Sequence, residues 1–518
     1  MKHNEPEYWE KQLANSPIPK GEAGFSKDLM QKIKERVEMQ ERPTNRRWLK
    51  LAPLLAISAM LVIGFFQWER LESMVGPMSK PVIPMALEPI DAEKEFTLKV
   101  AYFHENTFMM HYGKAYTIRY PNIEVKVITM GDNGWNSYDD KDKILELLDK
   151  EKPDVVYLSP NMYGELAKEG RLYPLDPVMK QDSYDLNSMY SGVTETLRTA
   201  ADGKLYGLSP DYEMNALYYN KDLFDKYGVQ YPKSGMTWEE TMQLAARFPV
   251  NGQGSDRVYG LLPSYYGDAS QLAEQIARTM GLSMTNADGN QVTLRTDGWK
   301  KAWSLAADGY SQGYVYQPEP RANPQGNILM EDMYKRNPFI TGKAAMAYSG
   351  YSLSRDLETA KSQYKMNSFN WDMVSEPVDS SRPNESASFA LGPVYAVNAQ
   401  SEHQRAAWEM IKLINSTEII KKLNRSAGGG SLSVRLQSLK PEDGRNYAPF
   451  YSMKPSTVGA ESGLHPRVLR KFKEAYSPLA VKQMKAVVEG RLKLDDALKQ
   501  LQEDSQNALF SALLDSRN

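Results

Sequence analysis

Residues 203–228, which read GKLYGLSPDYEMNALYYNKDLFDKYG, carry more information about the fold than any other stretch of this chain. The apolar run ALYY at residues 216–219 predicts a buried strand. Residues 220–222 (NKD) predict the end of that strand and the N-terminal cap of a short helix. We expect that helix to carry its apolar side chains on one side, namely Leu223, Phe224 and Tyr227.

Composition narrows the classes of protein to which the chain can belong. Its 518 residues are enough for two or more lobes with cores of their own. The net charge of −2 provides no basic surface for nucleic acid, so we expect no nucleic-acid partner. Cysteine is absent, which excludes disulfides, thiolate metal sites and a lipid-modified cysteine anchor. Tyrosine outnumbers phenylalanine by 31 to 14, an excess that is compatible with sugar binding and equally with the hydrated surface of a secreted protein.

Strands and helices alternate from residue 96 onward. The segments Phe96–Tyr102, Ile123–Thr129 and Val155–Leu158 predict three strands. A helix is predicted over residues 143–150, between the second strand and the third. Such alternation indicates a mainly parallel sheet covered on both faces. Ligands of such sheets bind beyond the carboxyl ends of the strands.

A series of motifs resembles one family in the same order along the chain. Residues 203–228 resemble the hinge-crossing segment of bacterial extracellular solute-binding proteins of the maltodextrin-binding type. Further segments are similar to motifs of that family, namely residues 120–127 (YPNIEVKV), 152–177 (beginning KPDVVYL), 339–351 (FITGKAAMAYSGY), 393–418 (beginning PVYAVNA) and 489–509 (beginning EGRLKLD).

The resemblance implies an α/β fold of the two-lobed, periplasmic-binding-protein-like type II class, with a ligand cleft between the lobes. Lobe one is expected to hold residues 96–208 and 345–391, and lobe two residues 209–344 and 392–518. The lobes are expected to close around a small-molecule ligand, most naturally an oligosaccharide or similar solute. The resemblance also implies delivery to the permease subunits of an ABC importer, with no cofactor and no enzyme activity.

The same resemblance nominates ligand-binding residues at the crossings between lobes. Glu213 stands seven positions before Asn220, where the family carries an acidic or polar ligand contact, and Asp211 is its neighbour in the same loop. A carboxylate can accept hydrogen bonds from two hydroxyls of a diol. Ser352 stands beside the place where the family commonly has a cleft tryptophan, which argues against a long maltodextrin platform. The aromatic candidates for stacking on a sugar are Tyr265, Tyr266, Tyr348 and Tyr351.

Polar residues also follow two predicted strands of lobe one. Asn161 and Tyr163 come after the third strand, and His104 and Asn106 come after the first. Because ligands bind beyond the carboxyl ends of such strands, we expect these four side chains to face the cleft.

The sequence predicts no metal site. His104 and His111 lack an adjoining carboxylate pattern. Residues 286–290 (NADGN) lack the spacing and the closing glutamate of a calcium loop, and they predict a β-turn instead.

Residues 48–68 (WLKLAPLLAISAMLVIGFFQW) predict one transmembrane helix with tryptophan at both ends. Basic residues concentrate before it, so we expect residues 1–47 in the cytoplasm and the binding part outside the cell, after an extended linker at residues 69–95. A cleaved signal peptide is the alternative, which the long preceding segment opposes. Residues 25–37 predict an amphipathic helix that lies on the membrane, docks on a partner or serves as a tether.

Two other functions are compatible with this sequence. A ligand sensor would report occupancy of the cleft through the cytoplasmic tail. A carbohydrate-active enzyme would need a pair of catalytic carboxylates, and nothing in the pattern singles out such a pair. The identity of the ligand stays open, because a few loop side chains determine it.

Overall fold

The computed structural model describes residues 86–130, 140–252, 254–264, 267–318, 329–425, 431–439, 444–458 and 464–515. The chain divides into two compact units, Met1–Pro84 and Met85–Asn518, and the described residues all belong to the second. The predicted tail, the predicted membrane span at residues 48–68 and most of the predicted linker therefore lie outside the described residues. Within the described ranges, no helix combines the length and apolar character needed to cross a membrane.

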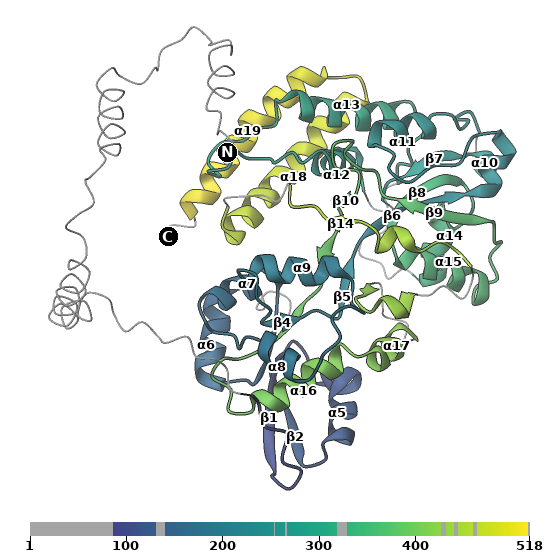
Figure 1. Cartoon of the computed structure of the whole chain (residues 1–518). Coiled ribbons are helices and arrows are strands. Elements are labelled where there is room, and N and C mark those ends of the chain that lie inside the picture. Colours follow the sequence, from purple (N-terminus) through teal and green to yellow (C-terminus); the bar gives the residue numbers. More distant parts are fainter. Residues whose placement is uncertain are drawn as a thin grey trace, which may run out of the picture. The chain divides into compact units, whose positions relative to one another are not determined.

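Lobe one is built on a five-stranded sheet with the order β2-β1-β3-β12-β4 (Figure 1). β1 runs parallel to β2 and β3, whereas β12 runs antiparallel to β3 and β4. The first three predicted strands are confirmed with their predicted bounds. The strands of this sheet are β1 (Phe96–Tyr102), β2 (Ile123–Thr129), β3 (Val155–Leu158), β4 (Gly207–Leu208) and β12 (Val394–Val397).

Helices from two separate stretches of the chain cover this sheet. They are α4 (Glu105–Phe108), the π-helical turn η1 (Met109–Gly113), α5 (Lys114–Arg119), α6 (Lys141–Glu151), α7 (Pro160–Lys168), α8 (Asp176–Gln181), α9 (Ser191–Ala200), α16 (Gln404–Ile414), α17 (Thr417–Arg425) and the 3₁₀ turn η3 (Leu436–Leu439).

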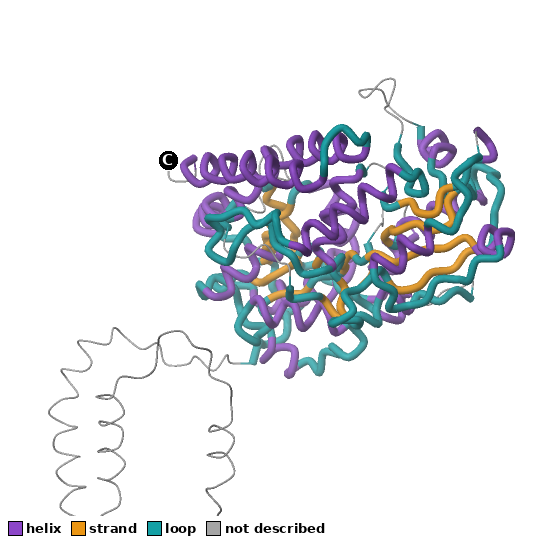
Figure 2. The backbone as a smooth tube through the Cα atoms, turned by 90° about the horizontal axis from the view of Figure 1, so that it is seen from above, coloured by secondary structure: helices purple, strands orange, loops and turns teal. Residues whose placement is uncertain are grey.

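Lobe two is built on a four-stranded sheet with the order β7-β8-β6-β9. Its strands are β6 (Asn215–Asn220), β7 (Tyr259–Leu262), β8 (Ala344–Gly350) and β9 (Trp371–Ser375). Its helices are α10 (Lys221–Tyr227), α11 (Trp238–Ala245), η2 (Gly254–Asp256), α12 (Ala269–Thr279), α13 (Asp297–Ser311), α14 (Met330–Arg336), α15 (Ser352–Ser362), η4 (Ala448–Phe450), α18 (Pro466–Val488) and α19 (Leu494–Asp515). Figure 2 shows the strands in orange among the helices and loops of the molecule.

Short strands connect the two lobes. β5 (Asp211–Glu213) is the middle strand of a three-stranded sheet, between β11 (Ala390–Leu391) and β13 (Leu432–Ser433). A second pair of short strands joins β10 (Glu385–Ser386) to β14 (Lys454–Pro455) in parallel. Figure 1 labels β5 between the lobes, directly before β6 enters the second sheet. These pairings hold segments from three distant parts of the chain together at the hinge.

The predicted division of residues between the lobes is wrong for β8 and β9 and for β12, α16 and α17, whereas α18 and α19 belong to lobe two as predicted. β8 and β9 pair with β6, so residues 344–375 belong to lobe two and not to lobe one. β12 pairs with β3 and β4, so it returns the chain to lobe one, where α16 and α17 follow. The chain therefore comes back to lobe one only after β11, about 45 residues later than the motif at residues 339–351 implied.

Two hydrophobic cores meet at the sheet of lobe two. Successive side chains of β6 point to opposite faces, as in any strand. Ala216 and Tyr218 belong to a core that continues through the hinge into lobe one. Leu217 and Tyr219 belong to a second core, which α11, α12, α13, α18 and α19 cover. Both faces of this strand are buried, which explains its continuous apolar run.

Local signals in residues 203–228 are confirmed in detail. The Asn220 side chain accepts a hydrogen bond from the Leu223 amide at 3.2 Å and caps α10. Leu223 and Phe224 are buried, as expected for the apolar side of that helix. Gly228 ends the helix with φ +64°, a left-handed conformation that glycine adopts without strain.

Candidate functional site

A row of three polar side chains runs along the strand that joins the lobes. Asp211 and Asn215 are partly exposed and Glu213 is exposed, whereas Tyr212 and Met214 between them are buried. Because side chains alternate along a strand, the three polar residues share one face. At about 3.3 Å per residue, the row covers about 13 Å. We call Asp211, Glu213 and Asn215 the polar row.

The opposite face of β5 is held by aromatic packing. The Tyr212 ring stacks on Tyr190 with a centroid separation of 4.7 Å, and its hydroxyl donates to the Phe450 carbonyl at 2.8 Å. Phe389 stacks on the same ring at 5.8 Å. A fully buried tyrosine with its hydroxyl satisfied fixes which face of the strand is buried. The polar row is consequently turned away from this packing.

Asp211 occupies an enclosed position at the lobe-one end of the row, although part of its surface remains exposed. Burial, together with repulsion from Glu213, raises the pKa of the Asp211 carboxyl to about 7. Among the residues that the structure describes, none donates a hydrogen bond to this carboxylate. Such a group is available to a ligand, because nothing in the described chain satisfies it.

Five aromatic rings form a cluster at the lobe-one end of the row. Tyr102 contacts Phe103 at 4.2 Å and Tyr157 at 4.9 Å between centroids, and Tyr395 lies 5.4 Å from Tyr157. Tyr112 approaches Tyr395 at 5.9 Å, and their hydroxyl oxygens are 3.5 Å apart. Burial and then the charge of nearby groups, Asp211 included, raise the pKa values of the Tyr102 and Tyr112 hydroxyls. Asp211 therefore lies close to this aromatic cluster.

The π-helical turn η1 contributes one ring of the aromatic cluster. Tyr112 lies within it, and π-helical turns occur often at functional sites. Gly113 lies so close to Met109 that an added Cβ would meet its sulfur at 2.3 Å. The tight turn brings Tyr112 inward, next to Tyr395 on the neighbouring strand.

A small cavity of about 220 Å³ lies at the lobe-two end of the polar row. Asn215 from the row lines it, together with Gln275 of α12 and Asn337 after α14. The Gln275 Oε1 atom is buried and has no hydrogen-bond partner in the described part of the chain. Every polar side chain in its lining is uncharged, which suits the hydroxyls of a neutral ligand.

Tyr348 lines this cavity, but it is mainly a packing residue. Only 8% of its surface is exposed, and its hydroxyl donates to Glu376 Oε2 at 3.0 Å. Its ring packs edge-on against Trp238 at 5.1 Å. Tyr351 is half-buried and packs edge-on against Tyr447 and Phe450.

The four polar candidates of lobe one have different environments. His104 and Asn106 are exposed at the start of α4, directly after β1. Asn161 is exposed on α7 and lines a hollow of about 860 Å³ between α7 and α18. Tyr163 is fully buried, and its hydroxyl accepts a hydrogen bond from the Tyr206 amide at 3.2 Å. Tyr163 thus supports α7 from within lobe one and presents no surface to a ligand.

The remaining predictions concern metals and two tyrosines. Tyr265 and Tyr266 lie outside the described residues. Residues 286–290 form the predicted turn: Asn286 accepts from the Asn290 amide at 3.0 Å, between the bridged residues Thr285 and Val292. The ranges described here hold no group of three metal-ligating side chains.

Sequence reasoning missed several residues of this site. Asn215 is not among the predicted ligand contacts, although the pattern DYEMN alternates polar and apolar residues. That alternation was a usable signal. The aromatic cluster and Gln275 had no such signal, because their members come from separate elements that meet only in three dimensions.

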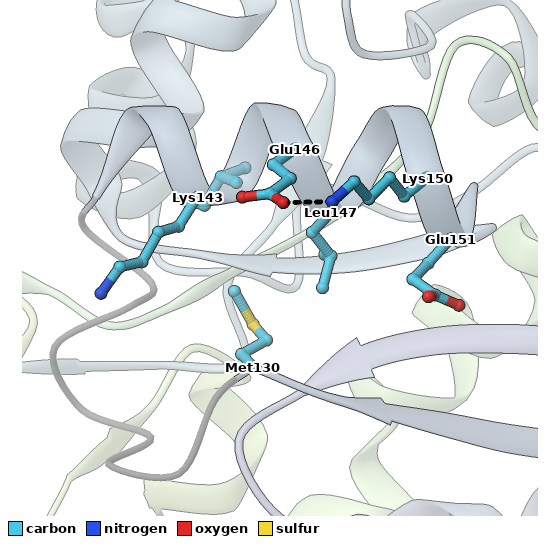
Figure 3. A pocket seen from close by; sticks show the side chains of 7 residues that line it. Met130, Lys143, Glu146, Leu147, Lys150 and Glu151 are labelled. Atoms are coloured by element: carbon cyan, nitrogen blue, oxygen red, sulfur yellow. Dashed lines mark hydrogen bonds and ion pairs between the residues drawn. The ribbon is translucent and has the colours of Figure 1, made fainter.

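A separate hollow of about 260 Å³ lies on the outer side of lobe one, beside α6 (Figure 3). Met130 and Leu147 form its apolar side, and an ion pair joins Glu146 to Lys150 along the helix. Both charged groups are exposed and already paired. This hollow offers no unsatisfied polar group of the kind that Asp211 provides.

The amino-acid sequence is similar to those of known binding proteins. A sequence profile described as "Bacterial extracellular solute-binding protein" matches residues 111–449. A putative binding protein of Brucella abortus is 34% identical over 100 residues, which are 19% of this chain and 22% of that protein. The match thus spans about a fifth of the length of the curated relatives.

Solved structures resemble the chain over most of its length. The sugar-binding protein MalE of Xanthomonas citri is 19% identical, with a TM-score of 0.57 over 82% of this chain and 100% of that one. An extracellular solute-binding protein family 1 member of Alicyclobacillus acidocaldarius is 16% identical, with a TM-score of 0.58 over 81% of this chain and 100% of that one. A sugar transporter of Rhizobium etli in an open conformation is 20% identical, with a TM-score of 0.54 over 79% of this chain and 99% of that one. These similarities establish the two-lobed, periplasmic-binding-protein-like α/β fold.

Proposed function

We propose that this chain, which belongs to the family of bacterial extracellular solute-binding proteins, captures a carbohydrate, most naturally an oligosaccharide, for an ABC importer. The family is non-enzymatic, in agreement with the prediction that the chain binds its ligand without transforming it. Its ligand would bind along the polar row and bring the two lobes together. The permease and the ATPase would be separate chains.

The polar row is the observation that carries this proposal. It joins an enclosed carboxylate at one lobe to a cavity of neutral polar side chains at the other. A length of about 13 Å matches an extended ligand of more than one sugar ring. Carboxylate and amide oxygens accept hydrogen bonds from sugar hydroxyls, and the amide nitrogens of Asn215 and Gln275 donate to them. The names of two similar structures, a sugar transporter and a sugar-binding protein, support the same class of ligand.

Hinge closure follows from the position of the row on a connecting strand. β5 pairs with β11 and β13, which are themselves short connecting strands. Small changes of φ and ψ in such segments move whole lobes. Arg467 at the start of α18 already contacts Asp140 at the start of α6, with 3.3 Å between Nη2 and Oδ2. This partly exposed pair joins the two lobes, and on its own it would add little to the stability of their contact.

A membrane anchor completes the proposal. The predicted span at residues 48–68 would keep the binding part at the outer surface, with residues 1–47 inside the cell. Tethering raises the effective concentration of the receptor at its permease. Deletion of residues 1–47 should leave ligand uptake intact if the tail is a tether. A lost transcriptional response with normal uptake would instead favour the sensor.

A thermal-shift screen of the full-length protein against neutral oligosaccharides tests the proposal. Ligand bound only by the folded state raises stability by RT ln(1 + [L]/Kd), so a true ligand raises the melting temperature with the logarithm of its excess over Kd. Glu213→Ala should reduce that shift, because it removes a carboxylate from the middle of the row. The matched control is Glu503→Ala, which removes an exposed glutamate on α19. An unchanged shift in Glu213→Ala excludes Glu213 from the site, and no shift with any carbohydrate contradicts the proposed ligand class.

A further inference from the structure

We infer that the subsite at Asp211 receives a positively charged group, so the ligand is an amino sugar or an oligosaccharide that carries an ammonium group. This inference rests on the proposed function and specifies the chemistry of its ligand. It assigns the ammonium to the lobe-one end of the polar row. The uncharged part of the ligand would extend toward the cavity of lobe two.

The first argument is an excess of negative charge on one strand face. Asp211 and Glu213 are two residues apart, so their carboxylates lie on the same side of β5. No lysine, arginine or histidine in the described part of the chain forms an ion pair with either of them. Glu376 near the hinge, by contrast, accepts hydrogen bonds from Tyr348 and from the Ser388 amide. A cation is the partner that this pair of carboxylates would attract most strongly.

The second argument is the environment of the Asp211 carboxylate. Gly392 makes room for it, because an added Cβ at that residue would lie 2.1 Å from Asp211 Oδ1. The titratable groups that interact with it electrostatically are Glu213 from its own strand and Tyr102 and Tyr112 from lobe one. None of these is positively charged. Enclosing an unpaired carboxylate is costly, and an ammonium ion removes that cost more fully than a neutral hydroxyl does.

The third argument is the fit of an ammonium group to these neighbours. An ammonium has three N–H donors and no acceptor. The carboxylates of Asp211 and Glu213 can both accept hydrogen bonds from it. Aromatic rings near a cation add attraction through their negative faces. The raised pKa of Asp211 supports this assignment, since a nearby cation would restore its ionised form.

The two ends of the polar row differ in charge, which orients the ligand. The lobe-two cavity is lined by neutral polar side chains, Asn215, Gln275 and Asn337 among them. A charged group placed there would find no counter-ion in the lining. A ligand with its ammonium group at Asp211 and a hydroxylated sugar ring at Asn215 would therefore match the charge at both ends of the polar row.

Calorimetric titration of the full-length protein with matched ligand pairs tests this inference. Each pair differs only at carbon 2 of the sugar ring, where one member has a hydroxyl and the other an ammonium: galactose against galactosamine with one such position, and cellotriose against the glucosamine trimer with three. Spermidine serves as a cation without a sugar. We expect the amine to bind at least about tenfold more tightly than its hydroxyl counterpart. Rising NaCl concentration should weaken amine binding more than neutral binding.

Variants identify the subsite. Asp211→Asn should abolish the preference for the amine, because it weakens binding of the amine much more than binding of the neutral counterpart. Asp288→Asn is the control, because it removes an exposed carboxylate from the turn at residues 286–290 and changes the net charge equally. Glu213→Gln is the second variant, and it should reduce the amine preference as well. Unchanged circular dichroism shows that each variant is folded.

The outcomes separate this inference from the proposed function. Equal or tighter binding of the neutral member of every pair overturns the inference and leaves carbohydrate binding intact. An amine preference that persists in Asp211→Asn also overturns it. Binding of spermidine without any sugar supports the cation subsite and contradicts the carbohydrate proposal. If no amine binds at all, the inference fails.

Discussion

The carboxylate of Asp211 lies directly against the backbone at Gly392. An added Cβ at residue 392 would lie 2.1 Å from Asp211 Oδ1 and 2.5 Å from its carbonyl oxygen. The Gly392 amide also donates to that carbonyl oxygen at 3.2 Å. Two crossings between the lobes therefore touch at this point, one entering lobe two and the other returning to lobe one. This contact fixes the position of the acidic end of the polar row.

Gly392→Ala should displace the Asp211 carboxylate. The new methyl group overlaps backbone as well as side chain, so we expect a loss of about 1–3 kcal/mol in the free energy of unfolding. Ligand binding should weaken too, because the carboxylate moves. Urea denaturation and calorimetric titration measure the two effects. Gly350→Ala is the stability control, since its Cβ would meet only ordinary contacts at 3.5 Å and beyond. Equal stability of the two variants would contradict this account.

Asp211→Asn should change how stability depends on pH. The folded-state pKa of Asp211 is about 7, above the usual 3.8 of an aspartate. A folded state that holds its proton more tightly is most stable below pH 3.8 and loses stability as the pH rises through 7. The asparagine variant lacks this loss, so relative to the wild type it should gain stability between pH 4 and pH 8. Thermal unfolding across that range measures the difference, and parallel curves for the two proteins would refute the assignment.

Asp182→Asn should weaken the attachment of α8 to α16. Asp182 accepts hydrogen bonds from Arg405 at 2.8 Å, Lys412 at 2.6 Å and Trp408 at 2.9 Å. Burial alone would raise its pKa, but these donors outweigh burial and lower the pKa to about 2. The resulting stability is present above pH 3.8 and is lost as the pH falls through 2.

We expect Asp182→Asn to cost about 2 kcal/mol at pH 7, because charge-assisted hydrogen bonds are replaced by neutral ones. The difference from the wild type should shrink as the pH is lowered toward 2. Urea denaturation at pH 7 and at pH 3 measures both values. A constant difference between these conditions would show that the Asp182 charge is not responsible.

Tyr348→Phe should destabilise the hinge side of lobe two. The variant removes the hydroxyl that donates to Glu376, a carboxylate with only 1% of its surface exposed. Burial already raises the pKa of Glu376, and loss of a donor should raise it further. We expect a loss of about 1–3 kcal/mol at neutral pH and a smaller one in acid, where Glu376 is protonated. Tyr227→Phe on α10 is the control, and an equal effect in both variants would contradict the role of Glu376.

Local patterns predicted much of the fold. The strands β1, β2 and β3 and the capped helix α10 depend on residues adjacent in sequence, so their patterns were sufficient. The assignment of β8 and β9 to lobe one failed because it depended on pairing with β6, which lies more than 120 residues away. A strand with both faces buried reads as apolar in either lobe, so its sequence contains no information on its partner.

The candidate site, like the fold, was predicted from the sequence only in part. The family motif nominated Asp211 and Glu213 but placed them in a loop, whereas pairing with β11 and β13 puts both side chains on one face of a strand. Tyr163 and Tyr348 were also nominated, yet packing buried their rings, since exposure depends on neighbours from other elements. Likewise, only the folded chain brings Gly392, the aromatic cluster and Gln275 to the two ends of the polar row, because hydrophobic burial and strand pairing act between segments hundreds of residues apart.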